Sequence, residues 1–505
     1  MLQKLWHDRR LSIAATAGIT VLIALLAFLI MPRGPTTTVQ ALLAMFLGLT
    51  AGLAAGLAMK SRWAMLVTPA VYVITTEIAW LNIAGPTVDG IRLDETFGIL
   101  AFVTGRVFYG MLCLLPMVLG ASLGAWYARR ISGHAPPVES KLKAAARWTP
   151  TVLLSIFLIL LAIVVALPAT TPPIVDANGK AIPGSIAELT TVKIGGHDQA
   201  ILIRGHSTDK PVLLYLAGGP GQSDMALPRV LFDELEKDFI IVCWDQRGTG
   251  KSYSALDPVS TLTFDSAVSD TIEVTDYLRE RFGEDKIYLM GESYGSILGV
   301  ETIKKRPDLY HAYIGSGQMV NIKETDRRIY YDLLDYANRT GDKELAAKML
   351  AYGEPPYDDL MAYPYVAANY EKTAGPYTKP ESYTQRKDAS GIGPLNNLAG
   401  EYTLIEKVNT VRGLIDMYSI MYPQVQDIDL RKDANKLDVP VYVLDAKYEI
   451  PGRRDLALEW YEQLDAPKKQ MFVIDHAGHA AAFEGFEEFT RIMNEVVVPE
   501  TYFGK

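Results

Sequence analysis

The sequence is poor in cysteine and histidine, which narrows the chemistry open to it. Among 505 residues there are two cysteines, Cys113 and Cys243, and seven histidines. The two cysteines lie in separate apolar runs, so they cannot build the disulfide framework of a small secreted domain. Neither cysteine has the spacing of a metal ligand. We therefore expect neither a disulfide-rich fold nor a structural metal site.

An excess of positive charge is also lacking. The formal net charge is -9, with +7 in the first 150 residues and -16 in the remainder. Domains that bind nucleic acid present basic surfaces, so we expect no nucleic-acid partner.

The sequence is rich in long apolar runs. A helix needs about 20 residues to cross a bilayer. Runs of this kind lie near residues 11–31, 39–59, 63–82, 107–127 and 150–168. They predict a five-helix transmembrane region over residues 1–169, in contact with the lipid bilayer, followed by a linker over residues 170–189.

The cations of the loops predict the orientation. Ten Lys and Arg residues fall in loops on the amino-terminal side of the predicted helices, against only Arg33 and Arg92 on the other side. Lys and Arg are retained on the cytoplasmic side. The amino terminus is therefore predicted to be cytoplasmic, and five crossings would place the rest of the chain outside the cytoplasm, in a multi-pass protein of the cell membrane.

Glycines recur every four residues in two of these helices, at Gly48, Gly52 and Gly56 and again at Gly120 and Gly124. Such repeats allow close contact between helix backbones. We interpret them as packing within one chain, with an oligomer formed through the same faces as the alternative.

Glu77 and Arg106 are the only charged residues that the prediction places inside the membrane. Either charge alone would cost about 2.5 kcal/mol or more near mid-bilayer. We predict that they form an ion pair, and a role in transport or sensing is the alternative.

Beyond residue 190, β-rich runs alternate with helical patterns. The expected strands are TTVKI (190–194), AILIRG (200–205), PVLLYLA (211–217), FIIVCWD (239–245), KIYLMG (286–291), HAYIGSG (311–317), VPVYVLD (439–445) and MFVID (471–475). Several are apolar throughout, as in strands buried on both faces of a parallel sheet. The pattern predicts an α/β core over residues 190–319 and 438–505, with a Tyr-rich helical insert over residues 320–437.

One turn of this core carries the pattern of a nucleophile elbow. Gly291-Glu292-Ser293-Tyr294-Gly295 follows an expected strand and precedes an expected helix, which is the setting that lifts a serine to the top of the sheet. An oxyanion hole needs one amide after the nucleophile and one from an earlier glycine-rich loop. We assign it to the amides of Tyr294 and Gly219.

A serine nucleophile also needs a base and an acid that orients the base. His479 lies in a loop after the last expected strand and is preferred to His476, because it directly follows Gly478. For the acid, Asp445 at a strand end and Glu449 in the following loop are both open.

These segments resemble the α/β-hydrolase superfamily and, within it, the prolyl iminopeptidase-like serine peptidases. The resemblance covers about residues 190–500 and rests on AGGPG at 217–221, DQRGTGKS at 245–252, the elbow and Gly478-His479. It implies an α/β-hydrolase core with a helical cap. It also places Glu449 at the position of the acid.

The sequence departs from that family in ways that bear on the substrate. Ala217 replaces a family histidine in the oxyanion loop, and AKYE replaces the family's G-R-x-D acid segment. The family recognises a free amino terminus through cap glutamates. Candidates here are Glu324, Glu371, Glu401 and Glu406.

The sequence therefore predicts a membrane-anchored serine hydrolase that needs no metal or organic cofactor. By resemblance its substrate is a short peptide with a small or proline amino terminus. The alternatives are an esterase of small or lipid-derived esters and a non-catalytic transporter or sensor that keeps the fold.

Overall fold

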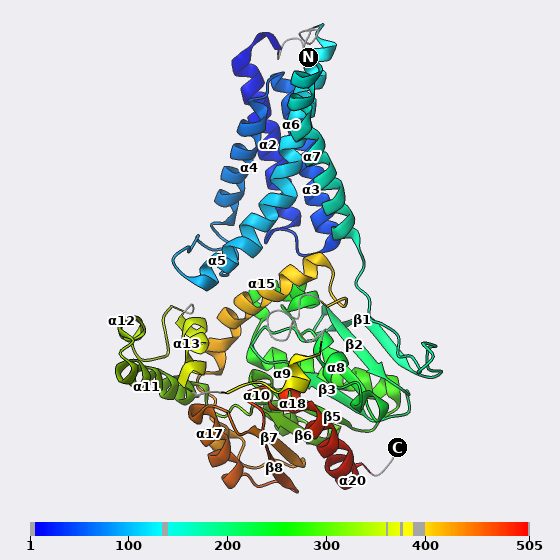
Figure 1. Ribbon diagram of the computed structural model, residues 1–505, viewed down its shortest axis with the longest axis vertical. Coiled ribbons are helices and arrows are strands. Elements are labelled where there is room, and N and C mark those ends of the chain that lie inside the picture. The colour runs from blue at the N-terminus through cyan, green and yellow to red at the C-terminus, as the bar shows by residue number, and fades with distance from the viewer. Residues whose placement is uncertain (1–5, 134–139, 360–361, 374–376, 387–398, 503–505) are drawn as a thin grey trace. The chain divides into compact units, whose positions relative to one another are not determined.

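The chain forms two compact units in the computed structural model (Figure 1). The first comprises Met1–Ala169 with Thr403–Arg412, and the second comprises Thr170–Tyr402 with Gly413–Lys505. The structure describes residues 6–133, 140–359, 362–373, 377–386 and 399–502.

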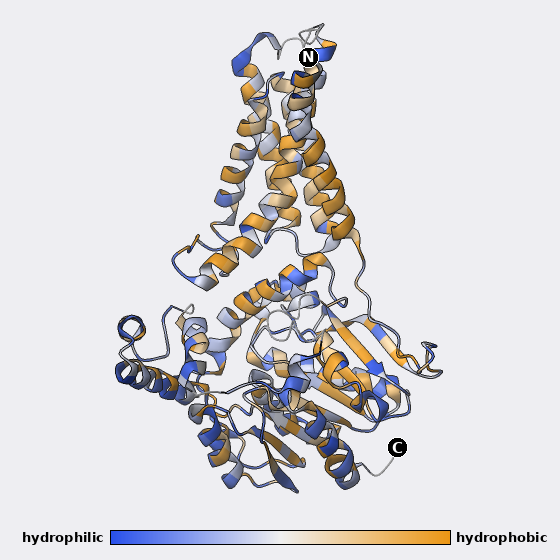
Figure 2. Ribbon diagram, viewed as in Figure 1, coloured by the Kyte–Doolittle hydropathy of each residue, from blue (hydrophilic) through white to orange (hydrophobic). Residues whose placement is uncertain are grey.

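The first unit contains the apolar helices of the amino-terminal region. They are α2 (Arg9–Ile30), α3 (Thr38–Met59), α4 (Ala64–Trp80), α5 (Thr96–Phe102), α6 (Phe108–Ile131) and α7 (Lys141–Ala166). A π-helical turn, Val103–Val107, joins α5 to α6 in one continuous helix. Apolar residues predominate along these helices (Figure 2). Four helices are long and apolar enough to cross a membrane, and α4, with 17 residues, is a shorter fifth.

The glycine repeats bring α3 and α6 into close contact. A Cβ on Gly52 of α3 would overlap the carbonyl oxygen of Met117 in α6, and one on Gly120 would overlap that of Leu49. The other glycines of both repeats lie against the partner helix in the same way. Both glycine faces are therefore used for packing within the chain.

The second unit is built on one eight-stranded sheet in the order β1-β2-β4-β3-β5-β6-β7-β8. Strands β3 to β8 are parallel, and β1 and β2 are antiparallel to their neighbours. The strands are β1 (Ile186–Ile194), β2 (His197–Gly205), β3 (Val212–Leu216), β4 (Ile240–Trp244), β5 (Ile287–Glu292), β6 (Tyr310–Ser316), β7 (Val441–Ala446) and β8 (Lys469–Ile474). Each expected strand is present. β1 starts inside the predicted linker, because Ile186 already pairs with Gly205 of β2.

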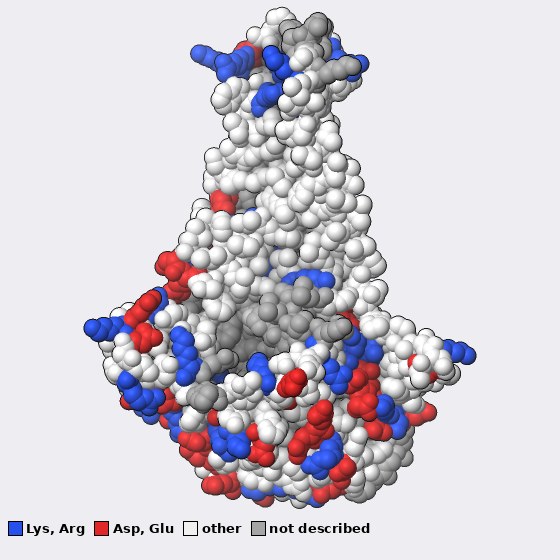
Figure 3. Space-filling view, viewed as in Figure 1, with Lys and Arg blue, Asp and Glu red and all other residues white. Residues whose placement is uncertain are grey.

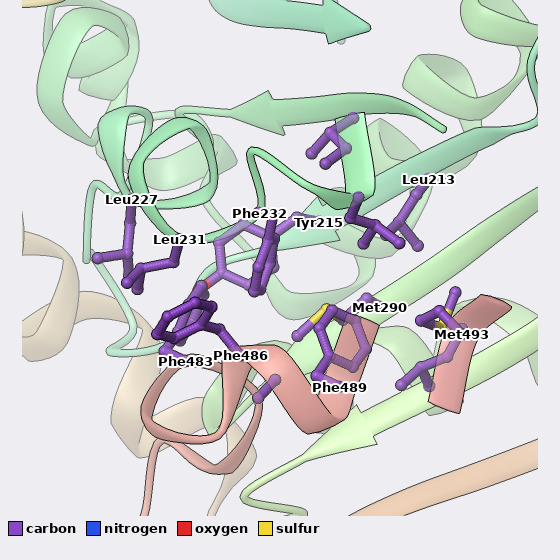
Figure 4. Packing of buried hydrophobic residues seen from close by; sticks show 14 of the residues in the cluster. Leu213, Tyr215, Leu227, Leu231, Phe232, Met290, Phe483, Phe486, Phe489 and Met493 are labelled. Carbon is purple, nitrogen blue, oxygen red and sulfur yellow. The ribbon is translucent and has the colours of Figure 1, made fainter. Parts of the chain in front are cut away.

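Helices cover both faces of this sheet. They are α8 (Ala226–Leu231), α9 (Phe264–Phe282), α10 (Tyr294–Lys305), α17 (Pro451–Gln463), α18 (Ala481–Glu484), α19 (Phe486–Ile492) and α20 (Val498–Thr501). Along β3, Leu213 and Tyr215 pack in one apolar cluster and their neighbours in the other, since alternate side chains point to opposite faces. Figure 4 shows the first cluster, in which the rings of Phe232 and Phe483 stack 5.2 Å apart.

The segment between β6 and β7 is helical, as the sequence predicts. It contains α11 (Ile322–Thr340), α12 (Lys343–Tyr352), α13 (Ala362–Tyr370), α14 (Glu381–Thr384), α15 (Leu404–Met421) and α16 (Leu430–Asp433). Tyr330 and Tyr370 are buried in an apolar cluster of this segment, and Tyr331 is exposed. Most of the tyrosines that form the pattern therefore fill a small core.

Candidate active site

Ser293 stands at the sharp turn between β5 and α10. Its backbone φ is +55°, one of two positive values among the described non-glycine residues. A side chain with a Cβ is strained there, and such strain concentrates at functional sites. The Ser293 amide donates to the Ser316 carbonyl of β6, which ties the turn to the neighbouring strand.

The glycines of the elbow make room for this turn. A Cβ on Gly295 would overlap the Leu216 carbonyl oxygen at the end of β3, and one on Gly291 would overlap the Gly295 carbonyl oxygen. The pattern G-x-S-x-G is therefore required by the close approach of β3, β5 and α10.

His479 lies in the loop between β8 and α18, with its ring beside Ser293. The distance from its Nε2 to the Ser293 Oγ is 2.9 Å. The other ring nitrogen, Nδ1, forms a short hydrogen bond with the Glu449 Oε2. Gly317 allows the ring to come this close, because a Cβ there would stand 3.0 Å from the imidazole Cε1.

Glu449, rather than Asp445, contacts the histidine. Asp445 lies at the end of β7 and forms an ion pair with Arg454 at 2.9 Å. Glu449 is buried, and it also accepts from the Ile450 amide at 2.9 Å and lies 3.4 Å from the Arg453 guanidinium. Burial on its own would raise the pKa of Glu449, but His479 and Arg453 outweigh it and bring the pKa to about 2. The carboxylate is therefore ionised at neutral pH.

The two amides assigned to an oxyanion hole have no acceptor among the described residues. Neither the Gly219 nor the Tyr294 backbone N–H donates a hydrogen bond within the described ranges. The glycine loop lies beside the serine, since a Cβ on Gly218 would stand 3.1 Å from the Ser293 Cβ. Tyr294 opens α10, where the first helical amides lack intrahelical partners.

A search of protein families matches residues 211–486 to the family described as alpha/beta hydrolase fold. This match spans more than half of the sequence. The chain belongs to the α/β-hydrolase family.

Individual relatives carry peptidase names. A probable aminopeptidase YbaC of Bacillus subtilis is 28% identical over 301 residues, which cover 59% of this chain and 93% of the relative. A proline iminopeptidase of Thermoplasma volcanium is 22% identical over 299 residues, covering 57% and 89%. The crystal structure of a proline iminopeptidase-related protein from Thermus thermophilus superposes with a TM-score of 0.39 at 20% identity, covering 63% of this chain and 98% of that one.

Two supporting residues of this α/β hydrolase were not foreseen from the sequence. Glu484 of α18 accepts from the Gly478 amide at 2.5 Å and from the Tyr377 hydroxyl at 2.7 Å, so it braces the loop that carries His479. Arg453 is the second. It belongs to Gly452-Arg453-Arg454-Asp455, which repeats the family's G-R-x-D letters, but Asp455 lies near Arg328 rather than at the histidine.

Buried acids surround the elbow. Glu292, next to the serine, is buried, and burial together with Asp224 and Glu449 raises its pKa well above the usual value. Asp224 accepts from the Tyr215 hydroxyl and the Gln222 amide, both at 3.0 Å. Burial raises the pKa of Asp224 to about 6. These acids have neutral hydrogen-bond partners or none, unlike Glu449.

The cap glutamates singled out in the sequence have other partners. Glu324 pairs with Arg327 and Arg328 on α11, Glu401 is buried against Arg229 at 2.6 Å, and Glu406 accepts from the Thr403 amide at the start of α15. The side chain of Glu371 lies outside the described residues.

A pocket of about 630 Å³ lies beside the histidine loop. Its lining includes Tyr377, Tyr448, His476 and Glu484, but neither Ser293 nor His479. The rings of Tyr377 and Tyr448 stack 4.8 Å apart at its wall. Within the described ranges, no cluster of three His, Cys, Asp or Glu residues could hold a metal ion.

Proposed function

We propose that this α/β hydrolase is a serine hydrolase that forms an acyl-enzyme on Ser293. The observation that carries the proposal is the continuous relay from Ser293 through His479 to Glu449. The Ser293 Oγ attacks the substrate carbonyl while Nε2 of His479 takes its proton. Buried Glu449 holds the Nδ1–H tautomer and stabilises the imidazolium.

The negative oxygen of the tetrahedral intermediate would be held by the amides of Gly219 and Tyr294. Their lack of other acceptors supports this role. His479 then returns its proton to the leaving group, and the bond from the carbonyl to that group breaks. A water attacks the acyl-enzyme, with the histidine again as base, and releases the acid and Ser293. No step requires a metal or organic cofactor.

For the substrate, we propose a short peptide with a free amino terminus, cleaved after its first residue. The names of the relatives, an aminopeptidase and a proline iminopeptidase, support this class. The charge of the site also favours it, because buried Asp224 beside the elbow, whose pKa is about 6, is ionised at neutral pH and would attract an ammonium group.

Esterase activity is the second candidate function, and one assay distinguishes it from aminopeptidase activity. Purified full-length protein is given nitroanilides of proline, alanine and leucine and nitrophenyl esters of short acids. An aminopeptidase releases nitroaniline from unblocked amides and not from their N-acetyl forms. Turnover of esters alone would overturn the peptidase proposal. The Ser293→Ala variant is the control for both activities.

We further propose that the helices anchor the hydrolase in a cell membrane with the catalytic unit outside the cytoplasm. The excess of cations on one side of the predicted spans supports this orientation, and Lys and Arg gather at the end of the helical unit near the amino terminus (Figure 3). Both native cysteines are buried, so introduced cysteines give a clean signal. In right-side-out vesicles, a membrane-impermeant maleimide should label Asp209→Cys and not Arg62→Cys. The reverse pattern would overturn the orientation.

A further inference from the structure

A pocket of about 200 Å³ lies among the helices of the first unit. It is bounded by α4, the π-helical turn and the start of α6. Most of its lining is apolar, but it also contains charged and hydroxyl-bearing side chains. The residues that matter here are Tyr72, Glu77, Trp80, Arg106, Tyr109 and Gly110.

The charged wall of the pocket is the ion pair predicted from the sequence. Arg106 meets Glu77 through two bonds of 3.0 Å, Nε to Oε1 and Nη2 to Oε2, and its Nη2 also donates to the Val88 carbonyl at 3.2 Å. The third nitrogen, Nη1, has no hydrogen-bond partner among the described residues. The Glu77 side chain remains 39% exposed. The two charges therefore neutralise each other, and the Arg106 Nη1 and the exposed part of the Glu77 carboxylate can still form hydrogen bonds with a ligand.

The backbone around Arg106 has an unusual conformation. Arg106 lies within the π-helical turn Val103–Val107, and such turns inside α-helices are frequent at functional sites. Its guanidinium also stands 5.2 Å from the ring of Trp80, whose indole N–H donates to the Pro32 carbonyl at 2.8 Å. A pair that served only to neutralise two charges would not need this local change of helix type.

The chemistry of the free groups identifies the ligand. Glu77 and Arg106 cancel each other's charge, so a phosphate or carboxylate head would meet the Glu77 carboxylate as well as the arginine. Hydroxyl groups both donate and accept, which matches the free acceptor positions of Glu77 and the free donors of Arg106. Glu77 lies near the end of α4, where the heads of lipids meet apolar chains, and Arg106 lies beside it in the π-helical turn.

We propose that this pocket binds the uncharged, hydroxyl-bearing head of a single-chain lipid of the glycerol ether or ester class. The pocket is smaller than the roughly 300–1,000 Å³ that encloses a whole drug-sized ligand. It therefore takes the head and the first part of the chain, and the rest of the chain lies in the bilayer. The hydrogen-bonded hydroxyls of Tyr72 and Tyr109, 2.6 Å apart, line the same pocket.

The chain offers a matched pair of variants for the test. Gly110 lines the pocket, and a Cβ there meets only the Leu114 Cδ1 at 3.6 Å, so Gly110→Leu can occupy part of the pocket while Glu77 and Arg106 are both retained. Gly18 of α2 is exposed and has nothing within 4 Å of an added Cβ. Gly18→Leu is therefore the control, and both changes raise helix propensity equally.

The probe is 1-O-hexadecylglycerol with a diazirine in its chain, because the ether linkage resists hydrolysis by the proposed active site. Full-length protein in phosphatidylcholine nanodiscs is irradiated, and the labelled peptides are identified by mass spectrometry. Labelling of α4 and α6 should fall at least roughly tenfold in Gly110→Leu and remain unchanged in Gly18→Leu. Unlabelled hexadecylglycerol should compete at a concentration at least about tenfold lower than hexadecyl phosphate or the matching lysophosphatidylethanolamine.

Equal labelling of the two glycine variants would overturn the site. Equal or better competition by the phosphate or the zwitterion would overturn the neutral head. Neither result depends on catalysis, because the probe is not a substrate.

Discussion

Glu449 in the second unit, which contains the sheet, and Glu77 in the first, helical unit both contact nitrogen atoms of basic side chains, but the two arrangements differ. Glu449 is buried and divides its oxygens between the His479 ring and Arg453. Glu77 is partly exposed and gives both oxygens to one arginine. The first arrangement leaves an imidazole free to exchange a proton with Ser293. The second arrangement holds an ion pair with no net charge, and both side chains can form further hydrogen bonds.

Asp224 completes the comparison, because it is buried without a cation. Its hydrogen-bond partners are the hydroxyl of Tyr215 and the amide of Gln222. Its pKa is raised to about 6 by burial, whereas the pKa of Glu449 is brought to about 2 by its partners despite burial. Glu449 and Asp224 are both buried, so it is the difference between their partners that separates the pKa values of these two acids.

The largest expected effect comes from replacing each of the two candidate acids, in separate variants, by its amide. Glu449→Gln removes the charge that orients and stabilises the His479 ring, and we expect kcat/KM to fall by about 10³–10⁴-fold. Asp445→Asn, which loses only an ion pair with Arg454, should cost less than about tenfold. Steady-state kinetics on the best amide or ester substrate measures both. A larger loss in Asp445→Asn would mean that the acid is misassigned.

The ion pair of the helical unit is tested by breaking it from one side. Arg106→Gln leaves Glu77 without its cation, and we expect a loss of about 3 kcal/mol in the free energy of unfolding. Adding Glu77→Gln should recover more than half of that loss, because no lone charge then remains. Unfolding in mixed detergent micelles, followed by circular dichroism, gives both values. If the single variant is as stable as the double, the two residues are not energetically coupled.

The pH dependence of stability separates acids with and without cations. Below about pH 4 Asp224 is protonated in both states. As the pH rises towards 6, the unfolded chain ionises while the folded protein keeps its proton, so stability falls. Asp224→Asn should therefore become more stable than wild type across this window, by on the order of 2–3 kcal/mol. Thermal unfolding of the full chain from pH 4 to pH 8 measures the difference.

Asp429 serves as a control, because its effect on stability should change with pH in the opposite direction to that of Asp224. Arg431 and Lys432 overcome the effect of its burial and bring its pKa to about 2. Its contribution is present above the unfolded pKa and is lost as the pH falls towards 2. Asp429→Asn should therefore destabilise the protein at pH 7 and progressively less in acid. Parallel curves for the two variants would contradict the assignment of charge by partner.

The smallest effect concerns the brace of the histidine loop. Glu484→Ala removes the acceptor of the Gly478 amide and of the Tyr377 hydroxyl. We expect kcat to fall by about tenfold, since one charge-assisted hydrogen bond positions the loop. Tyr377→Phe removes only one donor and should lose less. A change confined to thermal stability, with kcat intact, would show that the brace does not position His479.

Much of the second unit was predictable because the sequence patterns that indicate its strands and turns are local. The expected strands are short and several are apolar throughout, and the glycines around Ser293 are dictated by the turn itself. The choice between Asp445 and Glu449 was not local: four residues along a loop separate them, and only the folded path of that loop brings Glu449 to His479.

In the helical unit the cost of lone charges in a membrane predicted the pairing of Glu77 with Arg106, which is confirmed. The π-helical turn around Arg106 and the pocket beside it leave no mark in hydropathy or spacing. Glu484 was missed for a similar reason, because its role depends on a backbone amide rather than on a motif.

The most direct measurement is covalent capture of the serine. Full-length protein in membranes is treated with a fluorophosphonate, and the modified residue is identified by mass spectrometry. Our account predicts a single adduct on Ser293, absent in Ser293→Ala and formed far more slowly in His479→Gln. An adduct on another residue, or labelling that is unchanged in Ser293→Ala, would contradict it.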